Sequence, residues 1–473
     1  MEGLALLADP LYRYIQFTVP RDAEPAEPTE KALIDNPWVQ RLRFIHQLQS
    51  TWWVYPAGEH SRFQHSLGTM HLAGRFAEQL YPSLAEACRT LRGPCPSFPL
   101  VHATLRAAGL LHDVGHGPFS HFFDENYLQP RFSGLTHEIL GQRIIVRKLG
   151  GILRALRRSP AGPFGRGERV DPGWVAVLIR KPAGEDGPAV PHWVRLLRPV
   201  FSGIYTADNL DYIQRDAYMT GFSLDMVDTE RLLFYTFVHP MGLTIHRAGV
   251  PVLIRFLQAR VAMYSDVYYH RTTRAVDLQM REIFEDTMAE LLPEDPRRRL
   301  DQYLEITEWF LLQKVLEWAA PGRRGVTPKQ RELGRRWRDI LDRRVKWKMA
   351  YDYVATMNEA HQVMDFWKPD TLKEAIRQQL PPRLRKTAFE VDMATQDPRP
   401  LNPLAEGGKT VNVFNPATGE VSPRALREFF KDVPAKVAHY RVFAPDHRHD
   451  PELAQATELA LHAGRPEAYE TNL

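Results

Sequence analysis

Apolar residues recur at helical spacing along most of this chain, and this periodicity limits the fold more than any other feature of the sequence. The repeating segments are 29–49, 66–81, 101–112, 192–232 and 251–293, followed by a charged and mostly helical stretch from about 301 to 380. A helix with one apolar stripe must bury that stripe against another element, and here the available partners are mainly other helices. The sequence therefore predicts a mostly α fold.

Short segments of another kind interrupt the helical pattern. Strands are predicted at 11–19, in the strand-turn-strand segment 411–419 and at 439–445, and a last helix is predicted after residue 450. The length of 473 residues exceeds that of one ordinary domain. We expect an N-terminal strand and extension at 1–30, a helical core at 31–300 with an irregular Pro- and Gly-rich insertion at about 158–191, and a smaller α+β C-terminal region with helices and a β-hairpin at 301–473.

The composition is that of a soluble globular protein, with 44% hydrophobic and 25% charged residues. The N-terminus lacks a basic start followed by a long apolar run, and no stretch approaches the roughly 18 apolar residues of a membrane span. Cys88 and Cys95 are too few for a disulfide framework. We therefore expect a cytoplasmic protein with two unpaired thiols and no membrane contact.

Histidine is concentrated in one part of the chain, where nine of the 18 histidines fall between His46 and His137. Histidine ligates metals and titrates near neutral pH, so this excess marks a candidate reactive region. The net charge of +4 is modest for this length and does not by itself indicate a nucleic-acid binder.

The pair His112-Asp113 lies in this region. Leu105, Ala108 and His112 share one stripe of a predicted helix, which turns His112 toward whatever the helix packs on. An imidazole and a carboxylate at the end of a helix can bind one metal ion, but two ligands are too few for a stable site. The sequence therefore requires further ligands from elsewhere in the chain.

His65, in RFQHSLG, and Asp208, in ADNLDYIQRD, are the candidates for these further ligands. Neither cysteine is near them in sequence, which argues against a closed structural zinc site. Mixed histidine and carboxylate ligands suit one divalent transition metal (Mn, Fe, Co, Ni or Zn), and an additional Mg stays open.

An isolated His-Asp pair is more often a core histidine beside a capping aspartate than a metal site. Here RFxHS, LLHDxGHGPFSH and DxxDYxxRD follow one another in that order. These segments resemble the HD superfamily, and within it the bacterial members of the branch of deoxynucleoside triphosphate triphosphohydrolases of the SAM-and-HD-domain type. The similarity extends from DPLYRYI, near residue 9, to HRTTRAVDLQM, at about 270–280. The resemblance implies an HD-domain helical core and metal-dependent phosphohydrolase activity.

The resemblance also implies roles for single residues. It places the metal ligands at His65, His112, Asp113 and Asp208. It places the acid–base groups around the scissile phosphate at His116, His121, Asp124 and His137, with His121 as the proton donor oriented by Asp124. It places Arg62 against phosphate, Gln47 and Leu48 beside the deoxyribose, and Tyr212 and Asp216 near the sugar and the triphosphate. A purely structural role stays open for His121 and for His137.

The substrate-binding part of the resemblance is less complete. Asn209 replaces a lysine beside the metal, which removes a cation from the path of the phosphates. Where vertebrate members hold the triphosphate with an arginine, a tyrosine and a histidine, an ungapped match gives Asp266, Arg274 and Val276. We expect Arg271, Arg274 and His270 to restore positive charge from nearby.

Three further positions match a guanine-nucleotide activator site of the regulated family members. They are Asp35, Gln40 and Arg43, while the lysine that accompanies them in the family corresponds to Ala5. The alternative is structural: Asp35 would cap a helix, and Arg43 would form a buried salt bridge. The resemblance thus implies a nucleotide activator, and it also implies a homo-oligomer.

A basic stretch at 331–350 carries eight basic and three acidic residues, with Trp337 and Trp347 among them. This combination could bind single-stranded nucleic acid weakly, through phosphate contacts and stacking. The alternative is a solvated helical face whose tryptophans pack inward. His447 and His449 have no accompanying carboxylate pattern, and we expect them on the surface.

The leading hypothesis is hydrolysis of deoxynucleoside triphosphates to deoxynucleoside and triphosphate. An HD phosphohydrolase acting on nucleoside monophosphates, cyclic nucleotides or single-stranded nucleic acid is the alternative. A catalytically idle nucleotide sensor is a third hypothesis, whose signature would be a lost metal ligand, and the sequence has lost none of the four.

Overall fold

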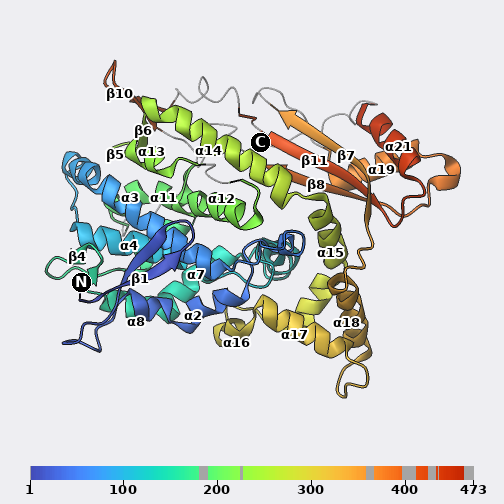
Figure 1. Ribbon diagram of the computed structural model, residues 1–473, viewed down its shortest axis with the longest axis horizontal. Helices are drawn as coiled ribbons and strands as arrows, with labels where there is room; N and C mark the ends of the chain where they lie inside the picture. Colours follow the sequence, from blue (N-terminus) through green and yellow to red (C-terminus); the bar gives the residue numbers. More distant parts are fainter. Residues whose placement is uncertain are drawn as a thin grey trace. The chain divides into compact units, whose positions relative to one another are not determined.

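The computed structural model describes residues 2–180, 190–223, 227–357, 367–396, 412–423, 433–434 and 436–462. The chain forms two compact units that interleave along the sequence (Figure 1). Unit 1 comprises Met1–Ala259, Met288–Lys314 and Pro403–Phe429, and unit 2 comprises Arg260–Thr287, Val315–Asn402 and Phe430–Leu473. The three-part division along the sequence stays a prediction.

Helices make up most of unit 1. The long ones are α3 (Arg62–Thr90), α4 (Phe98–Leu111) and α12 (Ala207–Thr220). The shorter ones are α1 (Glu30–Ile34), α2 (Pro37–Gln40), α5 (His121–Phe123), α6 (Gln129–Arg131), α7 (His137–Ile144), α8 (Gly150–Ala155), α9 (Pro172–Ile179), α10 (His192–Leu197), α11 (Pro199–Ser202), α13 (Thr229–Phe234) and α16 (Leu300–Glu305). Three helices contain residues of both units: α14 (Val250–Met263), α15 (Arg271–Leu291) and α17 (Glu308–Ala319).

The packing of α3 against α4 forms the centre of unit 1. A Cβ atom on Gly109 would lie 2.6 Å from the carbonyl oxygen of Thr69, so only glycine lets the two helices approach this closely. Apolar side chains between them, such as Phe76 and Leu105, are fully buried. The close approach also brings the start of α3 beside the end of α4.

Unit 1 also carries small sheets. The hairpin of β1 (Leu4–Asp9) and β2 (Arg13–Thr18) is antiparallel, with Leu4 opposite Thr18. A four-stranded sheet has the order β10-β9-β6-β5, in which β6 and β9 are parallel and the other pairs are antiparallel. Its strands are β5 (Thr236–His239), β6 (Gly242–His246), β9 (Asn412–Asn415) and β10 (Glu420–Ser422), and a further hairpin joins β3 (Arg158–Ser159) to β4 (Gly162–Pro163).

Unit 2 contains an antiparallel sheet with the order β7-β11-β8, formed by β7 (Lys348–Met357), β11 (Lys436–Ala444) and β8 (Glu390–Gln396). Helices α19 (Pro369–Gln379) and α21 (Asp450–His462) pack on it (Figure 1). Their side chains Leu372, Ile376 and Leu453 are buried together with Tyr440 of β11. Helix α18 (Pro328–Leu341) also belongs to this unit.

The predicted fold class, a mostly α core with a smaller α+β C-terminal part, is confirmed. The structure has the predicted strands at β2, β9–β10 and β11 and the predicted last helix at α21. The prediction of helix was wrong at β7, which pairs with β11 across about 90 residues of sequence. The insertion contains α9 and a hairpin whose two strands, β3 and β4, have two residues each. Its residues 181–189 lie outside the described part of the chain.

Two smaller predictions concern membrane contact and cysteine pairing. Within the described residues, no helix is both long and apolar enough to cross a membrane. Cys88 and Cys95 are free thiols, as expected.

Candidate metal centre

Two neighbouring helices of unit 1 bring two histidine rings together. His65 lies in the first turn of α3 and His112 directly follows α4, and their Nε2 atoms are 3.1 Å apart. The Nδ1 atoms lie 2.8 Å from Oδ2 of Asp211 and 2.8 Å from the carbonyl oxygen of Gly109, respectively. These acceptors assign the ring protons to Nδ1 and direct both Nε2 lone pairs into the same space. A cation between the rings would remove the resulting repulsion.

Two carboxylates complete this group. Oδ1 of Asp208, on α12, lies 3.1 Å from Nε2 of His65 and 3.6 Å from Nε2 of His112. Oδ1 of Asp113 lies 3.3 Å from Nε2 of His112, and its Oδ2 lies 3.8 Å from Nε2 of His65. The structure therefore brings together all four side chains expected as metal ligands. Two imidazoles and two carboxylates fit a divalent cation.

The electrostatics of the group also fit a cation. Burial by itself would lower the pKa of His65, but its hydrogen bonds with Asp208 and Asp211 raise that pKa to about 10. Burial opposes ionisation of Asp208, yet the two histidines hold its pKa below the usual value. The carboxylates thus attract positive charge strongly to this point, and a metal ion can take the place of the proton.

Helix α12 positions Asp208 through its N-terminal cap. Oγ1 of Thr206 accepts a hydrogen bond from the backbone N–H of Asn209 at 3.1 Å, and Oδ1 of Asn209 accepts one from the N–H of Thr206 at 2.6 Å. This reciprocal cap fixes the first turn, where Asp208 lies. The residue that replaces the family's lysine is therefore part of the cap.

Asp211 supports the metal centre from behind. It is fully buried and, besides Nδ1 of His65, accepts hydrogen bonds from the hydroxyl of Tyr12 at 2.8 Å and from Nε of Arg215 at 2.8 Å. Arg215 also pairs with Asp9, at 2.9 Å. A network of this kind fixes the tautomer and the orientation of the histidine.

Asp211 and Arg215 stand in the motif DxxDYxxRD, but no role was predicted for them. Their spacing contains a usable signal, because Asp208, Asp211 and Arg215 stand at i, i+3 and i+7 and so share one face of α12. A Cβ atom on Gly68 of α3 would lie 1.9 Å from Oδ1 of Asp211, so a glycine is required where this face meets α3. Only the packed helices reveal that the carboxylate reaches His65.

Replacing Asp211 with asparagine is expected to weaken metal binding by about 10–100-fold, because the ring of His65 loses the charged acceptor that orients it. Titration of the metal-free protein with Mn²⁺ or Co²⁺ measures the change. Asp301→Asn is the control, since Asp301 is exposed and pairs with Lys148 at the surface. Equal affinities for the Asp211 variant and the wild type would contradict this role.

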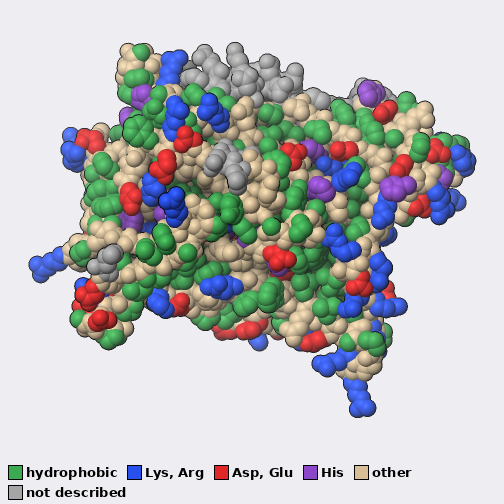
Figure 2. Space-filling view, in the orientation of Figure 1, with side chains coloured by type: hydrophobic (Ala, Val, Ile, Leu, Met, Phe, Trp, Pro, Cys, Tyr) green, Lys and Arg blue, Asp and Glu red, His purple; other side chains and the backbone are tan. Residues whose placement is uncertain are grey.

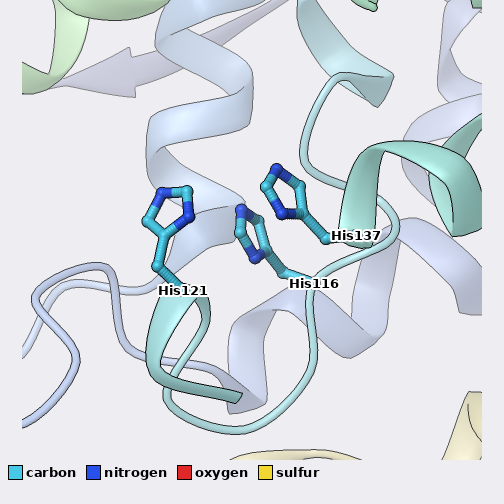
Figure 3. A group of neighbouring side chains, drawn as sticks. All are labelled: His116, His121 and His137. Carbon is cyan, nitrogen blue, oxygen red and sulfur yellow. The ribbon is translucent and has the colours of Figure 1, made fainter. Parts of the chain in front are cut away.

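A second histidine group, formed by His116, His121 and His137, lies in unit 1. The rings of His116 and His137 are stacked with centroids 3.6 Å apart, and the ring of His121 stands across both at 5.0 and 5.1 Å (Figure 3). Burial, together with the charges of Arg62 and His137, lowers the pKa of His116 well below its usual value. Burial of the ring nitrogens, together with the charges of His137 and Arg62, lowers the pKa of His121 to about 4. Both rings are therefore neutral near pH 7.

The fourth predicted acid–base residue, Asp124, pairs with His137. Oδ2 of Asp124 accepts from Nδ1 of His137 through a short hydrogen bond and from the backbone N–H of the same residue at 3.2 Å. The prediction that Asp124 orients His121 is therefore not what this conformation shows, because its hydrogen bonds go to His137. Its Oδ1 is buried without a hydrogen-bond partner among the described residues, so a ligand or water can use it.

Arg62 links the metal ligands to the turn that carries His121. Its Nη1 donates to Oδ2 of Asp113, and its Nε donates to Oγ of Ser120 at 2.5 Å. Phe119 and Ser120 are fully buried and have φ angles of 57° and 54°, a region that non-glycine residues rarely adopt. Such residues store about 1–3 kcal/mol of strain each and are common at functional sites.

The predicted sugar-contacting residues have different surroundings. Gln47 is buried, and its Oε1 has no hydrogen-bond partner among the described residues. The ring of Tyr212 lies 6.4 Å from that of His65. Asp216 is buried and its Oδ1 lies 2.8 Å from Nε2 of His60, so part of its carboxylate is already engaged. Leu48 is buried as well.

Arg271 and Arg274 belong to unit 2. Nε and Nη2 of Arg274 donate to the two carboxylate oxygens of Asp392 at 2.8 and 2.6 Å, and Nη1 approaches Asp277 at 3.4 Å. Two carboxylates therefore neutralise Arg274 within its own unit. Arg271 lines a cavity of about 390 Å³ together with Arg343.

The predicted activator residues lie near the start of unit 1. Asp35 is exposed, follows α1 as its C-cap and is bound by Lys31. Nε2 of Gln40 donates to the carbonyl oxygen of Ile34 at 2.7 Å, and its Oε1 accepts from Nε of Arg43 at 2.8 Å. Asp35 therefore caps a helix, as in the structural alternative, whereas Arg43 is exposed rather than part of a buried salt bridge.

The basic stretch at 331–350 lies in unit 2. Figure 2 shows Lys and Arg side chains gathered over α18. Trp337 is fully buried and donates to Oγ1 of Thr287 at 2.9 Å, and Trp347 is 5% exposed. Neither tryptophan is available for stacking on bases in this conformation, so the inward-packing alternative describes them. His447 is exposed, as expected, and His449 is partly so.

Comparison with known proteins identifies a domain that covers part of this site. Residues 62–157 match the HD domain. The chain shares 31% identity over 277 residues with the uncharacterized protein YwfO of Bacillus subtilis, covering 58% of this chain and 54% of that protein. It shares 27% identity over 299 residues with the deoxynucleoside triphosphate triphosphohydrolase SAMHD1 of Gallus gallus, covering 59% and 44%. The alignments thus span about half the length of these curated relatives.

A solved structure shows the same fold. The crystal structure of a hypothetical protein from Aquifex aeolicus superimposes with a TM-score of 0.64 at 22% identity, covering 97% of this chain and 100% of that chain. The matched segment of the HD domain contains His65, His112 and Asp113, which the structure brings together in one group. The chain therefore carries an HD domain at residues 62–157.

Proposed function

We propose that this protein is a metal-dependent phosphohydrolase that hydrolyses deoxynucleoside triphosphates to a deoxynucleoside and inorganic triphosphate. The observation that carries the proposal is the convergence of His65, His112 and Asp208, whose ligand atoms all lie within 4.8 Å of one another. A bound divalent ion would polarise a phosphoryl oxygen and lower the pKa of water there. One transition metal (Mn, Fe, Co, Ni or Zn) suits these ligands, and an additional Mg stays open.

The chain's own residues have distinct roles in this proposal. The planar guanidinium of Arg62, held beside Asp113, suits phosphate oxygens. His121 is exposed and neutral in the free protein. A bound phosphate adds negative charge beside its ring, which raises the pKa and favours uptake of a proton. His121 then passes this proton to the leaving 5′ oxygen. His137, hydrogen-bonded to Asp124, lines the site beside the ring of His121.

The relatives support the proposed chemistry. The chain carries an HD domain, and a Gallus gallus relative of modest identity is named as a deoxynucleoside triphosphate triphosphohydrolase. A nucleotide activator bound by Asp35, Gln40 and Arg43, assembly into a homo-oligomer, weak binding of single-stranded nucleic acid and a cytoplasmic location stay predictions.

A second candidate is a phosphohydrolase for a smaller substrate, such as a nucleoside monophosphate or a cyclic nucleotide. Two observations favour it. Asn209 stands where the family has a lysine and is used in the cap of α12. Arg274 is neutralised by Asp392 and Asp277. Of the cationic side chains expected to bind a triphosphate, the lysine is thus replaced by Asn209, and Arg274 is paired with carboxylates.

The deciding experiment is a screen of the purified protein against the four dNTPs, nucleoside monophosphates, cyclic nucleotides and single-stranded DNA. Each reaction is run with Mn²⁺, Mg²⁺, Co²⁺ and Ni²⁺, and the products are separated by chromatography. The proposal expects deoxynucleoside and tripolyphosphate from dNTPs. Orthophosphate from monophosphates without tripolyphosphate would favour the second candidate, and no product under any condition would contradict both.

A further inference from the structure

Glu308, the first residue of α17, is a fully buried carboxylate of unit 1 that the proposed chemistry does not use. Its Oε1 accepts from Nδ1 of His46 at 2.7 Å and from Nε1 of Trp52 at 3.1 Å. Its Oε2 lies 3.4 Å from the backbone N–H groups of His46 and Phe119, which donate to it. A buried carboxylate is tolerated only with such partners, and here the partners come from two separate loops.

The first loop is 46–53, which contains the predicted sugar-contacting position Gln47. The ring of His46 stacks on Trp52 with centroids 4.2 Å apart. His46 also forms an isolated β-bridge with Ser61, one residue before Arg62. A carboxylate that fixes His46 therefore fixes both this loop and the start of α3.

The second loop is the turn that precedes His121. Phe119 and Ser120 hold left-handed backbone conformations, which persist only where the surroundings impose them. The N–H of Phe119 donates to Glu308, and the hydroxyl of Ser120 accepts from Arg62. The ring of Phe119 also packs against Trp53 of the first loop, with centroids 5.6 Å apart.

The segment 303–308, which contains Glu308, also makes hydrogen bonds near the loop that joins Asp113 to His121. The hydroxyl of Tyr303 donates to the carbonyl oxygen of Gly115 at 2.7 Å. The buried guanidinium of Arg41 donates to the carbonyl oxygens of His116 at 2.6 Å and of Ile306 at 2.5 Å. Residues 303–308 therefore brace the loop between the metal ligands and His121, although they lie far beyond residue 157, where the HD domain match ends.

We infer that Glu308 is a positioning residue of the candidate active site, a single carboxylate that holds loop 46–53 and the turn before His121 in one arrangement. Through these loops it sets the positions of Gln47, Arg62 and His121 relative to the phosphate of a bound substrate. Its effect on turnover rests on the proposed function, whereas its effect on the two loops does not.

The test uses Glu308→Gln in the full chain, because glutamine keeps the shape but replaces one acceptor oxygen with a donor. Hydrogen exchange of the metal-loaded protein is expected to rise about tenfold in peptides covering 44–54 and 117–123 together, while the rest of unit 1 stays unchanged. Glu308→Asp should restore part of the protection. Glu294→Gln is the matched control, since Glu294 is exposed and forms a surface ion pair with Arg299.

The inference is overturned if exchange rises in neither loop, in only one of them, or equally throughout unit 1. With a substrate from the screen, Glu308→Gln is expected to lower kcat about tenfold and raise KM at unchanged metal content, because His121 and Gln47 are displaced together. Unchanged kcat and KM would also overturn it. If the wild type shows no turnover, the proposed function fails while the exchange measurement still decides the role of Glu308.

Discussion

Replacing His112 with alanine is expected to abolish tight binding of the divalent metal and to lower the rate of product formation by about 1000-fold or more, since the metal supplies several kcal/mol of transition-state stabilisation. Nε2 of His112 lies 3.1 Å from Nε2 of His65 and faces Asp208 at 3.6 Å, so the substitution removes one of the clustered donors. Its Nδ1 donates to the carbonyl oxygen of Gly109 in its own turn.

Metal content is measured by elemental analysis, and the rate of product formation is measured by chromatography on the best substrate of the screen. His192→Ala is the control, because His192 is an exposed histidine of the same unit on α10. One tightly bound metal ion per chain in the His112 variant would show that the ion lies elsewhere. Thermal unfolding of both variants verifies that the fold is retained.

Replacing His121 with asparagine is expected to lower kcat by about 10²–10⁴-fold while metal binding stays unchanged, because a positioned proton donor contributes that much to leaving-group departure. His121 stands across the stacked rings of His116 and His137 and outside the group of clustered metal ligands (Figure 3). Its exposure lets it reach a substrate that the buried His116 cannot reach.

A leaving group that needs no protonation separates this role from a structural one. With a substrate whose 5′ bridging oxygen is replaced by sulfur, the loss caused by His121→Asn should shrink to a few-fold, because a thiolate leaves without an acid. An equal loss with both kinds of substrate would identify His121 as a structural residue of the turn. His192→Asn serves as the control and should match the wild type with both substrates.

Short-range patterns predicted much of the candidate site. His65, His112 and Asp113 each stand in a compact motif, and Asp208 follows in a third motif, so these motifs and the family that they resemble pointed to the four residues. The structure brings them together because α3, α4 and α12 pack closely at Gly109 and Gly68. The identity of the metal and the substrate depends on chemistry that residue spacing does not contain.

The hydrogen-bond partners of these residues could not be predicted in the same way. Asp124 was expected to orient His121, but its hydrogen bonds go to His137, which lies 13 residues further along the chain. Asp211 joins Tyr12 from a hairpin 199 residues away in sequence. Glu308 reaches His46 across 262 residues. In each case the partner was chosen by packing, because a hydrogen bond depends on distance in space and carries no periodicity along the chain.

The same distinction explains the fold. Helical stripes are local, since each depends on residues three and four apart, and the sequence by itself therefore determined the mostly α class and the residue types available at the site. Strand β7 was missed because its stability comes from pairing with β11, far along the chain. Only the tertiary structure decided which imidazole meets which carboxylate, because burial and long-range contacts select among many arrangements that the local pattern permits equally.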